Sequence, residues 1–245
     1  MSSIDQDPYG ILESMRENGA YVDNTHVVYK AWTHGRKYLD KDAHLREPWV
    51  ADLITQLLAK RIVPWAIIIA PETRSQTNLG KVVASILDTD CISTKKVDDK
   101  HTFNPEELEC LHFGRPRILI DDIFNNGETL RQIVEGLRRY GLTLDGCHFM
   151  VDRNPAKSWE TWIPIQSLAT IQMDQWDEKD IPDDLIKKPI NTHIGKARNW
   201  VPSKGQELSA LFLAERLAKQ ELGFYFDDAR RIVGTEGEYT LSDNG

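Results

Sequence analysis

Hydrophobic positions along the first two thirds of the chain follow two different spacings. From Arg46 to Lys60 apolar residues recur every three or four positions, which is typical of a helix with one buried face, and the same spacing returns from Leu79 to Leu87. Between them, Trp65 to Ala70 is a short run rich in isoleucine, as in a strand buried on both faces. The pattern predicts a helix, a strand and a second helix in succession.

The alternation continues further along the chain. Ile118 to Ile120 is a second buried run, and Leu130 to Leu137 has helical apolar spacing that should end near Gly141. A third strand-like run extends from Cys147 to Arg153. Alternating strands and helices are the sequence form of a parallel sheet covered by helices, so an α/β fold is predicted.

Two other segments depart from this alternation. The charged stretch from Ser93 to Glu107 has no periodicity and is interpreted as a long surface loop, a kind of segment that often serves as a functional lid. Near the C-terminus, Gln206 to Leu222 has the apolar spacing of a helix. We expect one α/β core in residues 1–157, in which residues 1–40 are an added segment, and a C-terminal extension (158–245) packed on that core.

Composition narrows the class of protein. The chain has 245 residues, of which 40% are hydrophobic and 28% charged, so it can bury a sizeable core. Its net charge of -8 is opposite to that of proteins that coat nucleic acids or membrane surfaces. Three scattered cysteines indicate neither a disulfide framework nor a zinc site. With no apolar run long enough to cross a bilayer and an acidic start unlike a signal peptide, a cytoplasmic location is expected.

One segment carries recognisable chemistry. Asp121 and Asp122 follow a buried strand, at the carboxyl edge where open α/β sheets bind ligands. The turn and helix start that follow offer amides, a hydroxyl and free backbone N–H groups, which suit a phosphate; these residues are Asn125, Asn126, Gly127, Glu128 and Thr129. Two carboxylates beside a phosphate cradle indicate a phosphorylated sugar, whose hydroxyls they would hold directly or through Mg²⁺ and its waters. A strand, turn and helix with an acidic cap and no ligand is the alternative.

This segment, ILIDDIFNNGETL, resembles the phosphoribosyl-diphosphate (PRPP) signature of type I phosphoribosyltransferases. That signature is an apolar strand, two acids, two apolar residues, two small hydroxyl residues, a glycine, a small residue or Glu, and Thr; here Asn125 and Asn126 replace the hydroxyl residues. The resemblance implies a mostly parallel sheet flanked by helices, with an N-terminal hood over its carboxyl edge. It also implies Mg²⁺-dependent transfer of ribose 5-phosphate from PRPP to a nucleobase nitrogen, with release of pyrophosphate.

Two flanking segments are similar to the orotate phosphoribosyltransferase branch of this family. HVVYKAWTHGRKYLDKDA, residues 26–43, looks like its N-terminal segment and places Lys30 on the substrate side. CHFMVDR looks like the strand that ends in an Asp-Arg pair facing the base, which assigns Arg153 to the acceptor. The resemblance therefore implies orotate as the preferred acceptor and a role in pyrimidine biosynthesis.

The charged segment from Ser93 to Asn104 resembles the catalytic loop of the same enzymes. Lys96, Lys100 and His101 would neutralise the pyrophosphate as it leaves and help to exclude water. Asp98 and Asp99 interrupt the family spacing, and a solvated charged loop without a catalytic role is the alternative.

The segment after the first buried strand, PETRSQTNLG, departs from the family. A short glycine-bearing loop usually binds pyrophosphate there through backbone amides, whereas this chain offers Arg74 as a donor and Glu72 as an opposing charge. A ligand-binding loop and a purely structural loop both remain open. This departure and the two asparagines also leave open a catalytically inactive PRPP-binding or nucleotide-binding regulatory protein.

A homodimer is the last expectation. In the family that the chain resembles, the catalytic loop of one subunit commonly reaches the active site of its neighbour. The segments outside the core also carry large apolar side chains that are typical of an interface; they include Trp159, Trp162, Trp176 and Trp200.

Overall fold

The computed structural model describes residues 5–29, 32–72, 77–108, 114–155, 162–191 and 193–195, together with the backbone of three short strands between residues 225 and 240. The chain divides into two compact units, and the division falls within the short strands β1 (Tyr21–Val22) and β4 (Tyr38–Leu39). Unit 1 comprises Met1–Tyr21 and Leu39–Gln172, and unit 2 comprises Val22–Tyr38 and Met173–Gly245. None of the described helices is long and apolar enough to cross a membrane.

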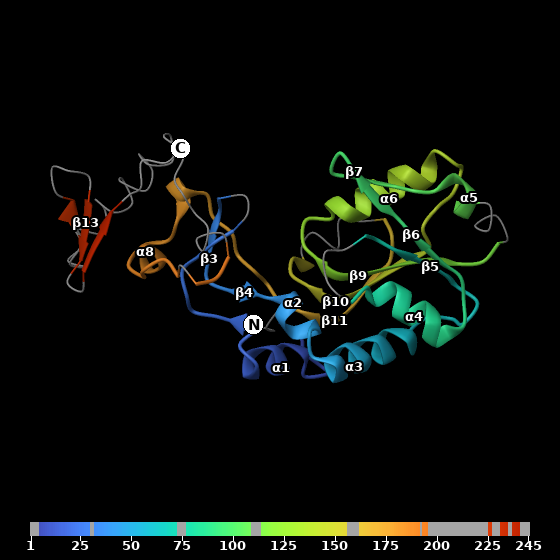
Figure 1. Cartoon of the computed structure of the whole chain (residues 1–245), viewed down its shortest axis with the longest axis horizontal. Coiled ribbons are helices and arrows are strands. Elements are labelled where there is room, and N and C mark those ends of the chain that lie inside the picture. The colour runs from blue at the N-terminus through green and yellow to red at the C-terminus, as the bar shows by residue number, and fades with distance from the viewer. Residues whose placement is uncertain are drawn as a thin grey trace. The chain divides into compact units, whose positions relative to one another are not determined.

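Unit 1 is built on a five-stranded sheet with the order β11-β10-β9-β5-β6 (Figure 1). All four neighbouring pairs are parallel, which confirms the predicted fold class. The strands are β5 (Ile67–Ala70), β6 (Cys91–Ser93), β9 (Arg117–Phe124), β10 (Gly146–Asp152) and β11 (Ile165–Thr170). Strand β9 lies at the centre, and β11 joins the sheet beyond residue 157, where we placed the end of the core.

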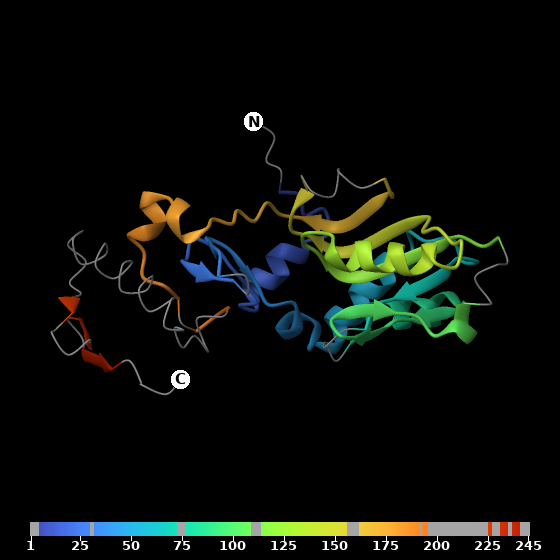
Figure 2. The same cartoon turned by 90° about the horizontal axis from the view of Figure 1, so that it is seen from above.

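Helices cover both faces of this sheet. Helix α6 (Glu128–Arg138) packs Leu130, Ile133 and Leu137 on one face, and α3 (Pro48–Ala59) and α4 (Leu79–Leu87) lie on the other (Figures 1 and 2). The three helices predicted for the core are thereby confirmed. The described residues of the unit form three shorter helices as well, namely α1 (Ile11–Glu17), α2 (Lys41–Leu45) and α5 (Pro105–Leu108). The helix expected from Gln206 to Leu222 lies outside the described residues.

Two expected boundaries were wrong. Strand β9 continues through Phe124 instead of ending at Ile120, so the two aspartates lie within the strand. The segment expected to be a long loop is a hairpin of β7 (Lys95–Val97) and β8 (Lys100–Thr102), followed by α5. All three residues of β7 are exposed, so no alternation of apolar and polar residues marks the strand. Asp98 and Asp99 form its turn with φ values of 49° and 60°, a conformation that aspartate tolerates better than most residues.

Gly80 allows α4 to approach β5 closely. A Cβ atom at this position would lie 2.7 Å from the Cβ of Ala70 and 3.2 Å from its Cα. We expect Gly80→Ala to lower the free energy of unfolding by about 1–3 kcal/mol, because overpacking outweighs the gain of up to about 1 kcal/mol in helix propensity. Urea unfolding measures this change, with Lys81→Ala at the exposed neighbouring position as control. Unchanged or higher stability of Gly80→Ala would contradict the close contact.

Unit 2 contains a hydrogen-bonded pair of buried histidines. Strands β2 (Val27–Val28) and β3 (His34–Gly35) pair antiparallel, and His26 Nε2 lies 2.8 Å from His34 Nδ1. His26 Nδ1 lies 3.1 Å from the carbonyl oxygen of Lys188, which can only accept, so this nitrogen carries the proton. His26 Nε2 therefore accepts from His34, and both rings are neutral.

The remaining described elements of unit 2 are short. They are a 3₁₀ helix (Glu178–Asp180), α8 (Asp183–Ile186), and β12 (Tyr225–Phe226), β13 (Arg231–Gly234) and β14 (Gly237–Thr240), which form an antiparallel sheet. Ile181, Leu185 and Ile186 form a small buried cluster, against which Trp176 and Ile190 pack.

The histidine pair should make stability sensitive to acid. Burial lowers the pKa of His34 from 6.5 to about 4, and repulsion from His26 when that ring is protonated adds to the shift. Between these values the unfolded chain binds the proton and the folded chain does not, so stability falls as the pH drops from about 6.5 toward 4. We expect His34→Gln to lose about 2 kcal/mol less than the wild type between pH 7 and pH 5 in urea unfolding. Equal losses for the two proteins would contradict this assignment.

Candidate active site

The two aspartates of β9 lie near the carboxyl end of the central strand. Asp121 shares its face of the sheet with Leu119, which packs in the α6 cluster, and Asp122 lies on the opposite face because strand side chains alternate. Backbone N–H groups fix both carboxylates: that of Asp122 donates to Asp121 Oδ1 at 2.9 Å, and that of Ile123 donates to Asp122 Oδ1 at 2.7 Å. The Oδ2 atoms of the two aspartates have different surroundings, because the side chains lie on opposite faces of the sheet.

Charge differs between the two acids. Desolvation within the protein raises the pKa of Asp121 from 3.8 to about 7, and the charge of Asp122 adds to the shift. Lys41 and Lys96 act in the opposite direction. Asp122 Oδ2 forms an ion pair with the ammonium of Lys41, the first residue of α2. Asp122 is therefore paired with Lys41, whereas Lys41 and Lys96 both act on Asp121 through their charges.

The turn after β9 has the features of a phosphate cradle. Gly127 has a φ of 73°, a left-handed conformation that glycine adopts without strain, and it leads directly into α6. The N–H of Glu128 donates to Asn126 Oδ1 at 3.1 Å, which closes the turn. The carboxylate of Glu128 bonds Arg131 at 2.6 Å and Gln132 at 2.9 Å, and these bonds lower its pKa. Thr129 is the second residue of the helix.

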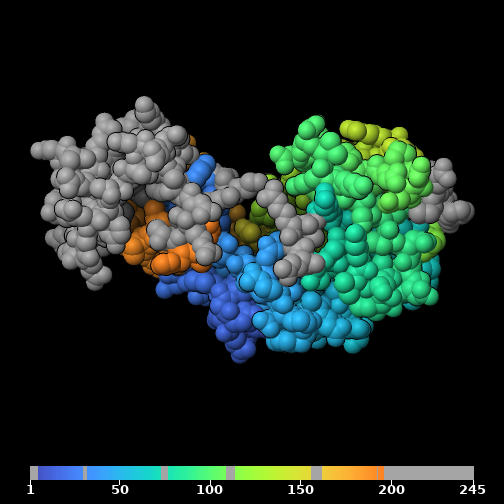
Figure 3. Space-filling model, viewed as in Figure 1, coloured from blue at the N-terminus to red at the C-terminus, as the bar shows by residue number. Residues whose placement is uncertain are grey.

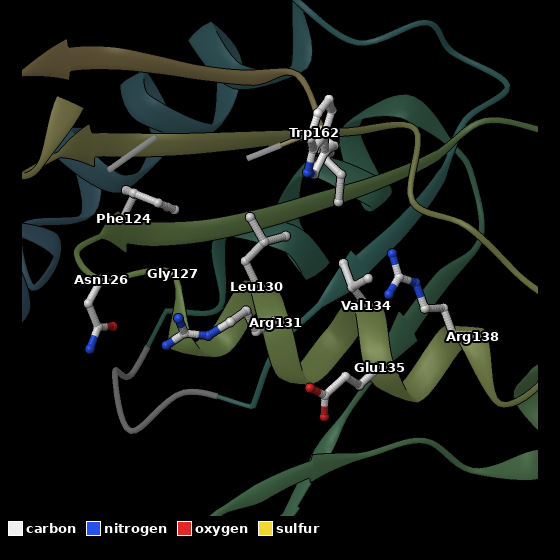
Figure 4. A pocket seen from close by; sticks show the side chains of 10 residues that line it. Phe124, Asn126, Gly127, Leu130, Arg131, Val134, Glu135, Arg138 and Trp162 are labelled. Atoms are coloured by element: carbon white, nitrogen blue, oxygen red, sulfur yellow. The ribbon is translucent and has the colours of Figure 1, made fainter. Parts of the chain in front are cut away.

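A cavity of about 540 Å³ adjoins this turn and extends along α6 (Figure 4). Asn126 and Gly127 lie at one end of it, Leu130 and Val134 line it from the helix, and the exposed Trp162 contributes from the segment before β11. Its volume is in the range of small-ligand sites. Neither Asp121 nor Asp122 lines the cavity. The cavity therefore begins at the turn and runs along α6, away from the two carboxylates.

Three hydrogen bonds among the described residues connect the β7–β8 hairpin to the rest of unit 1. The N–H of Lys96 donates to Glu72 Oε2 at 2.6 Å, just beyond β5. His101 Nδ1 lies 2.7 Å from Thr94 Oγ1, and the N–H of His101 donates to Gln132 Oε1 of α6 at 3.0 Å. His101 is buried, which lowers its pKa, with the charge of Lys96 as the second cause. The histidine and Glu72 therefore anchor the hairpin.

The hairpin register separates the expected catalytic lysines. Lys96 pairs with His101 and Val97 pairs with Lys100. Residues paired across an antiparallel ladder share a face and successive pairs alternate, so Lys96 and Lys100 lie on opposite faces of the hairpin. Lys96 shares the face of His101, which is bound to α6, and its charge acts on Asp121. Both lysines are exposed.

The structure places some of the other predicted site residues. The N–H of Arg153 donates to the carbonyl of Phe124 at 2.9 Å, so Arg153 lies beside the end of β9 at the carboxyl edge of the sheet. Lys30 and Arg74 lie outside the described residues. The sequence analysis did not find the ion pair between Lys41 and Asp122. These residues lie 81 positions apart, so no local pattern indicates their contact.

The residues present do not form a metal site made of protein groups alone. In the part of the chain that the structure describes, no three His, Cys, Asp or Glu side chains are grouped closely enough to hold an ion. Asp122 already forms an ion pair with Lys41, and Asp121 faces the other side of the strand. The described residues alone therefore do not supply the ligands for a metal ion.

Comparisons with known proteins agree with this geometry. No family model matches the chain. It is 21% identical over 183 residues to orotate phosphoribosyltransferase from Thermotoga petrophila, covering 74% of this chain and 94% of that protein. It is 23% identical over 174 residues to orotate phosphoribosyltransferase from Thermus thermophilus, covering 70% and 93%.

A solved structure shows the same architecture. The crystal structure of orotate phosphoribosyltransferase from Aeropyrum pernix superposes with a TM-score of 0.51 at 16% identity, covering 65% of this chain and 93% of that one. The resemblance noted in the sequence is thereby confirmed. The chain has the fold of the type I phosphoribosyltransferases and is similar in sequence to their orotate branch.

Proposed function

We propose that this protein transfers the ribose 5-phosphate unit of PRPP to a nucleobase nitrogen and releases pyrophosphate, with orotate as the preferred acceptor. The observation that carries the proposal is the central strand β9, which presents Asp121 and Asp122 and leads directly into the glycine turn at the start of α6. Similarity to orotate phosphoribosyltransferases over 74% of the chain supports the choice of acceptor. In this proposal Mg²⁺ enters as a complex with PRPP.

The reaction requires the protein to hold the ribose 5-phosphate, to stabilise the leaving anion and to position the acceptor. Departure of the diphosphate leaves positive charge on the anomeric carbon, so the ribose must be held and the leaving anion stabilised. Asp121 and Asp122 are proposed to bind the ribose hydroxyls, and the turn that ends in Gly127 to bind the 5-phosphate. Lys96 and Lys100 are proposed to neutralise the pyrophosphate, while Arg153 faces the acceptor. The bonded, buried position of His101 favours anchoring of the hairpin over contact with pyrophosphate.

A panel of acceptors tests the proposal. The purified full chain is incubated with PRPP, Mg²⁺ and either orotate, uracil, adenine, guanine or hypoxanthine, and pyrophosphate release is followed. Release that depends on orotate supports the full proposal. Release with another base retains the reaction and corrects the acceptor, whereas no release with any base contradicts the proposed enzyme.

A regulatory protein that binds PRPP or a nucleotide without turnover is the second candidate. Glu72 favours it, because this carboxylate follows β5 at the edge where a pyrophosphate would lie. Titration calorimetry separates the two candidates. Binding of PRPP with a Kd in the micromolar range, without consumption in the presence of the acceptor panel, would favour the regulatory protein.

We also propose a homodimer, in which α3 and α4 supply part of the contact. Trp49 and Leu53 on α3 and Val82 and Ile86 on α4 are exposed, and the two helices form a continuous surface, light blue and teal in Figure 3. Exposed apolar side chains on adjacent helices are typical of an interface. Trp162 is fully exposed, Trp176 is half-buried, and Trp159 and Trp200 lie outside the described residues. Light scattering that gives the monomer mass of 28.1 kDa would contradict the dimer.

A further inference from the structure

One side of α6 receives the β7–β8 hairpin. Glu128, Gln132 and Gly136 follow one another at intervals of four residues, so they lie in a row along the helix. This row is separate from the three buried positions of α6 that face the sheet, and α6 contacts β8. The row begins at Glu128, which directly follows the turn of residues 125–127, called here the phosphate turn.

The side-chain amide of Gln132 joins the start of this row to β8. Its Nε2 donates to Glu128 Oε1 at 2.9 Å, and its Oε1 accepts the N–H of His101 at 3.0 Å. A carboxylate oxygen only accepts and a backbone N–H only donates, so the group between them has to do both, as an amide does. Gln132 therefore connects the first residue after the phosphate turn to the backbone of the hairpin.

The paired residues Lys96 and His101 hold the hairpin at both of its edges. Lys96 donates its N–H to Glu72 Oε2 at 2.6 Å, and His101 donates its own N–H to the amide on α6. In an antiparallel pair of this kind both N–H groups point away from the neighbouring strand, so the two bonds lie on opposite edges. The backbone of Lys96 is thereby fixed between the segment after β5 and α6, and its charge acts on Asp121.

A second contact docks the same segment independently of the amide. Phe103 directly follows β8 and packs against the buried cluster under α6. A Cβ atom at Gly136 would lie 2.7 Å from Phe103 Cε2, so the ring rests on helix backbone that carries no side chain. Replacement of Gln132 therefore leaves the segment docked through Phe103, and its effect isolates the amide.

We infer that Gln132 is a positioning residue: its amide fixes the hairpin, and with it the backbone of Lys96, relative to the phosphate turn. Gln132 acts through Glu128 and His101. The docking of the hairpin follows from these contacts alone. The consequence for catalysis rests on the proposed function, in which Lys96 neutralises the pyrophosphate while the turn holds the 5-phosphate.

Hydrogen–deuterium exchange of two backbone amides in the full chain tests the positioning without turnover. The amide of His101 reports its bond to Gln132 directly, whereas the amide of Lys96 lies on the opposite edge and reports movement of the whole hairpin. Gln132→Met keeps the length and the helix propensity of the side chain, and both amides are expected to exchange about three- to tenfold faster than in the wild type. Gln166→Met, at an exposed position of β11, is the matched control and should change neither rate. Faster exchange at His101 alone, or at neither amide, would overturn the inference.

Reversing the two side chains on α6 provides a second test, which also serves if Gln132→Met does not fold. Gln132→Glu keeps the acceptor for His101 but places two carboxylates against each other, so both amides should exchange faster. The addition of Glu128→Gln restores a donor and an acceptor in reversed positions, and both rates should return to within about twofold of the wild type. Unchanged exchange in Gln132→Glu, or a double variant that exchanges equally fast, would overturn the direct link.

Steady-state kinetics separate positioning from substrate binding. Gln132→Met leaves the acid pair and the phosphate turn intact, so the KM for PRPP should change less than about threefold, while kcat should fall about tenfold because Lys96 is misplaced. A raised KM with unchanged kcat would overturn the consequence for catalysis. If the wild type releases no pyrophosphate with any base, the proposed function fails, and the two exchange tests still decide whether Gln132 positions the hairpin.

Discussion

Asp121→Asn is expected to abolish transfer and, at the same time, to stabilise the protein. The pKa of Asp121 is raised to about 7, so at higher pH the folded protein carries a carboxylate in surroundings that disfavour its charge. The stabilising effect of the shift is complete below the unfolded pKa near 3.8 and is lost as the pH rises toward 7. Asparagine has no such charge, so the variant should be more stable by about 1–3 kcal/mol at pH 8.

Two measurements on the same sample check this prediction. Urea unfolding at pH 8 and pH 4 should show the gain of Asp121→Asn at pH 8 and little difference at pH 4. Pyrophosphate release should fall at least about 100-fold, because the ribose loses a charged hydrogen-bond partner. Asp52→Asn, at an exposed position of α3, is the matched control and should change neither quantity. Lower stability of Asp121→Asn at pH 8, or retained transfer, would contradict the role of Asp121.

Lys100→Gln is expected to lower kcat about 100- to 1000-fold. A partner subunit that carries the wild-type lysine should restore part of the lost activity. A donor to the developing charge of the leaving group typically contributes an effect of this size. Because Lys96 and Lys100 lie on opposite faces of the hairpin, one hairpin does not direct both lysines toward one pyrophosphate. We therefore expect Lys96 to act within its own subunit and Lys100 to act in the neighbouring one.

Mixed subunits distinguish these arrangements. Lys100→Gln subunits are unfolded and refolded together with subunits that carry Asp121→Asn and Asp122→Asn. If Lys100 acts on the neighbour, half of the dimers are mixed and each has one complete site, so about a quarter of the wild-type activity should return. Lys95→Gln, in the same hairpin, is the control and should stay active. Absence of rescue in a verified mixed dimer would place Lys100 in its own subunit.

The sheet and its helices could be predicted because burial leaves a periodic record in the sequence. One face each of α3 and α4 lies on the core, so their apolar positions repeat with the period of a helix, whereas the run that ends in Ala70 is apolar throughout because β5 is buried on both faces. The hairpin leaves no such record, because β7 is exposed throughout. Asp98 and Asp99 were the available signal for a two-residue turn, yet they were interpreted only as an interruption of the family spacing.

Part of the candidate site could also be predicted from the sequence, and part could not. The acid pair and the glycine turn are neighbours in the sequence, so a single segment was enough to recognise them. The contacts of Lys41 with Asp122 and of Lys96 with Glu72 join positions 81 and 24 residues apart. Only tertiary packing brings these groups together, and no local spacing indicates it.

The central claim is that β9 and the turn after it bind PRPP for transfer, and product stoichiometry tests it most directly. The full chain is incubated with PRPP, Mg²⁺ and orotate, and pyrophosphate and nucleoside 5′-monophosphate are quantified by mass spectrometry. We expect equal amounts of the two products from the wild type and neither above background from the protein that carries both Asp121→Asn and Asp122→Asn. Formation of no nucleotide by the wild type, or equal formation by the two proteins, would contradict the claim.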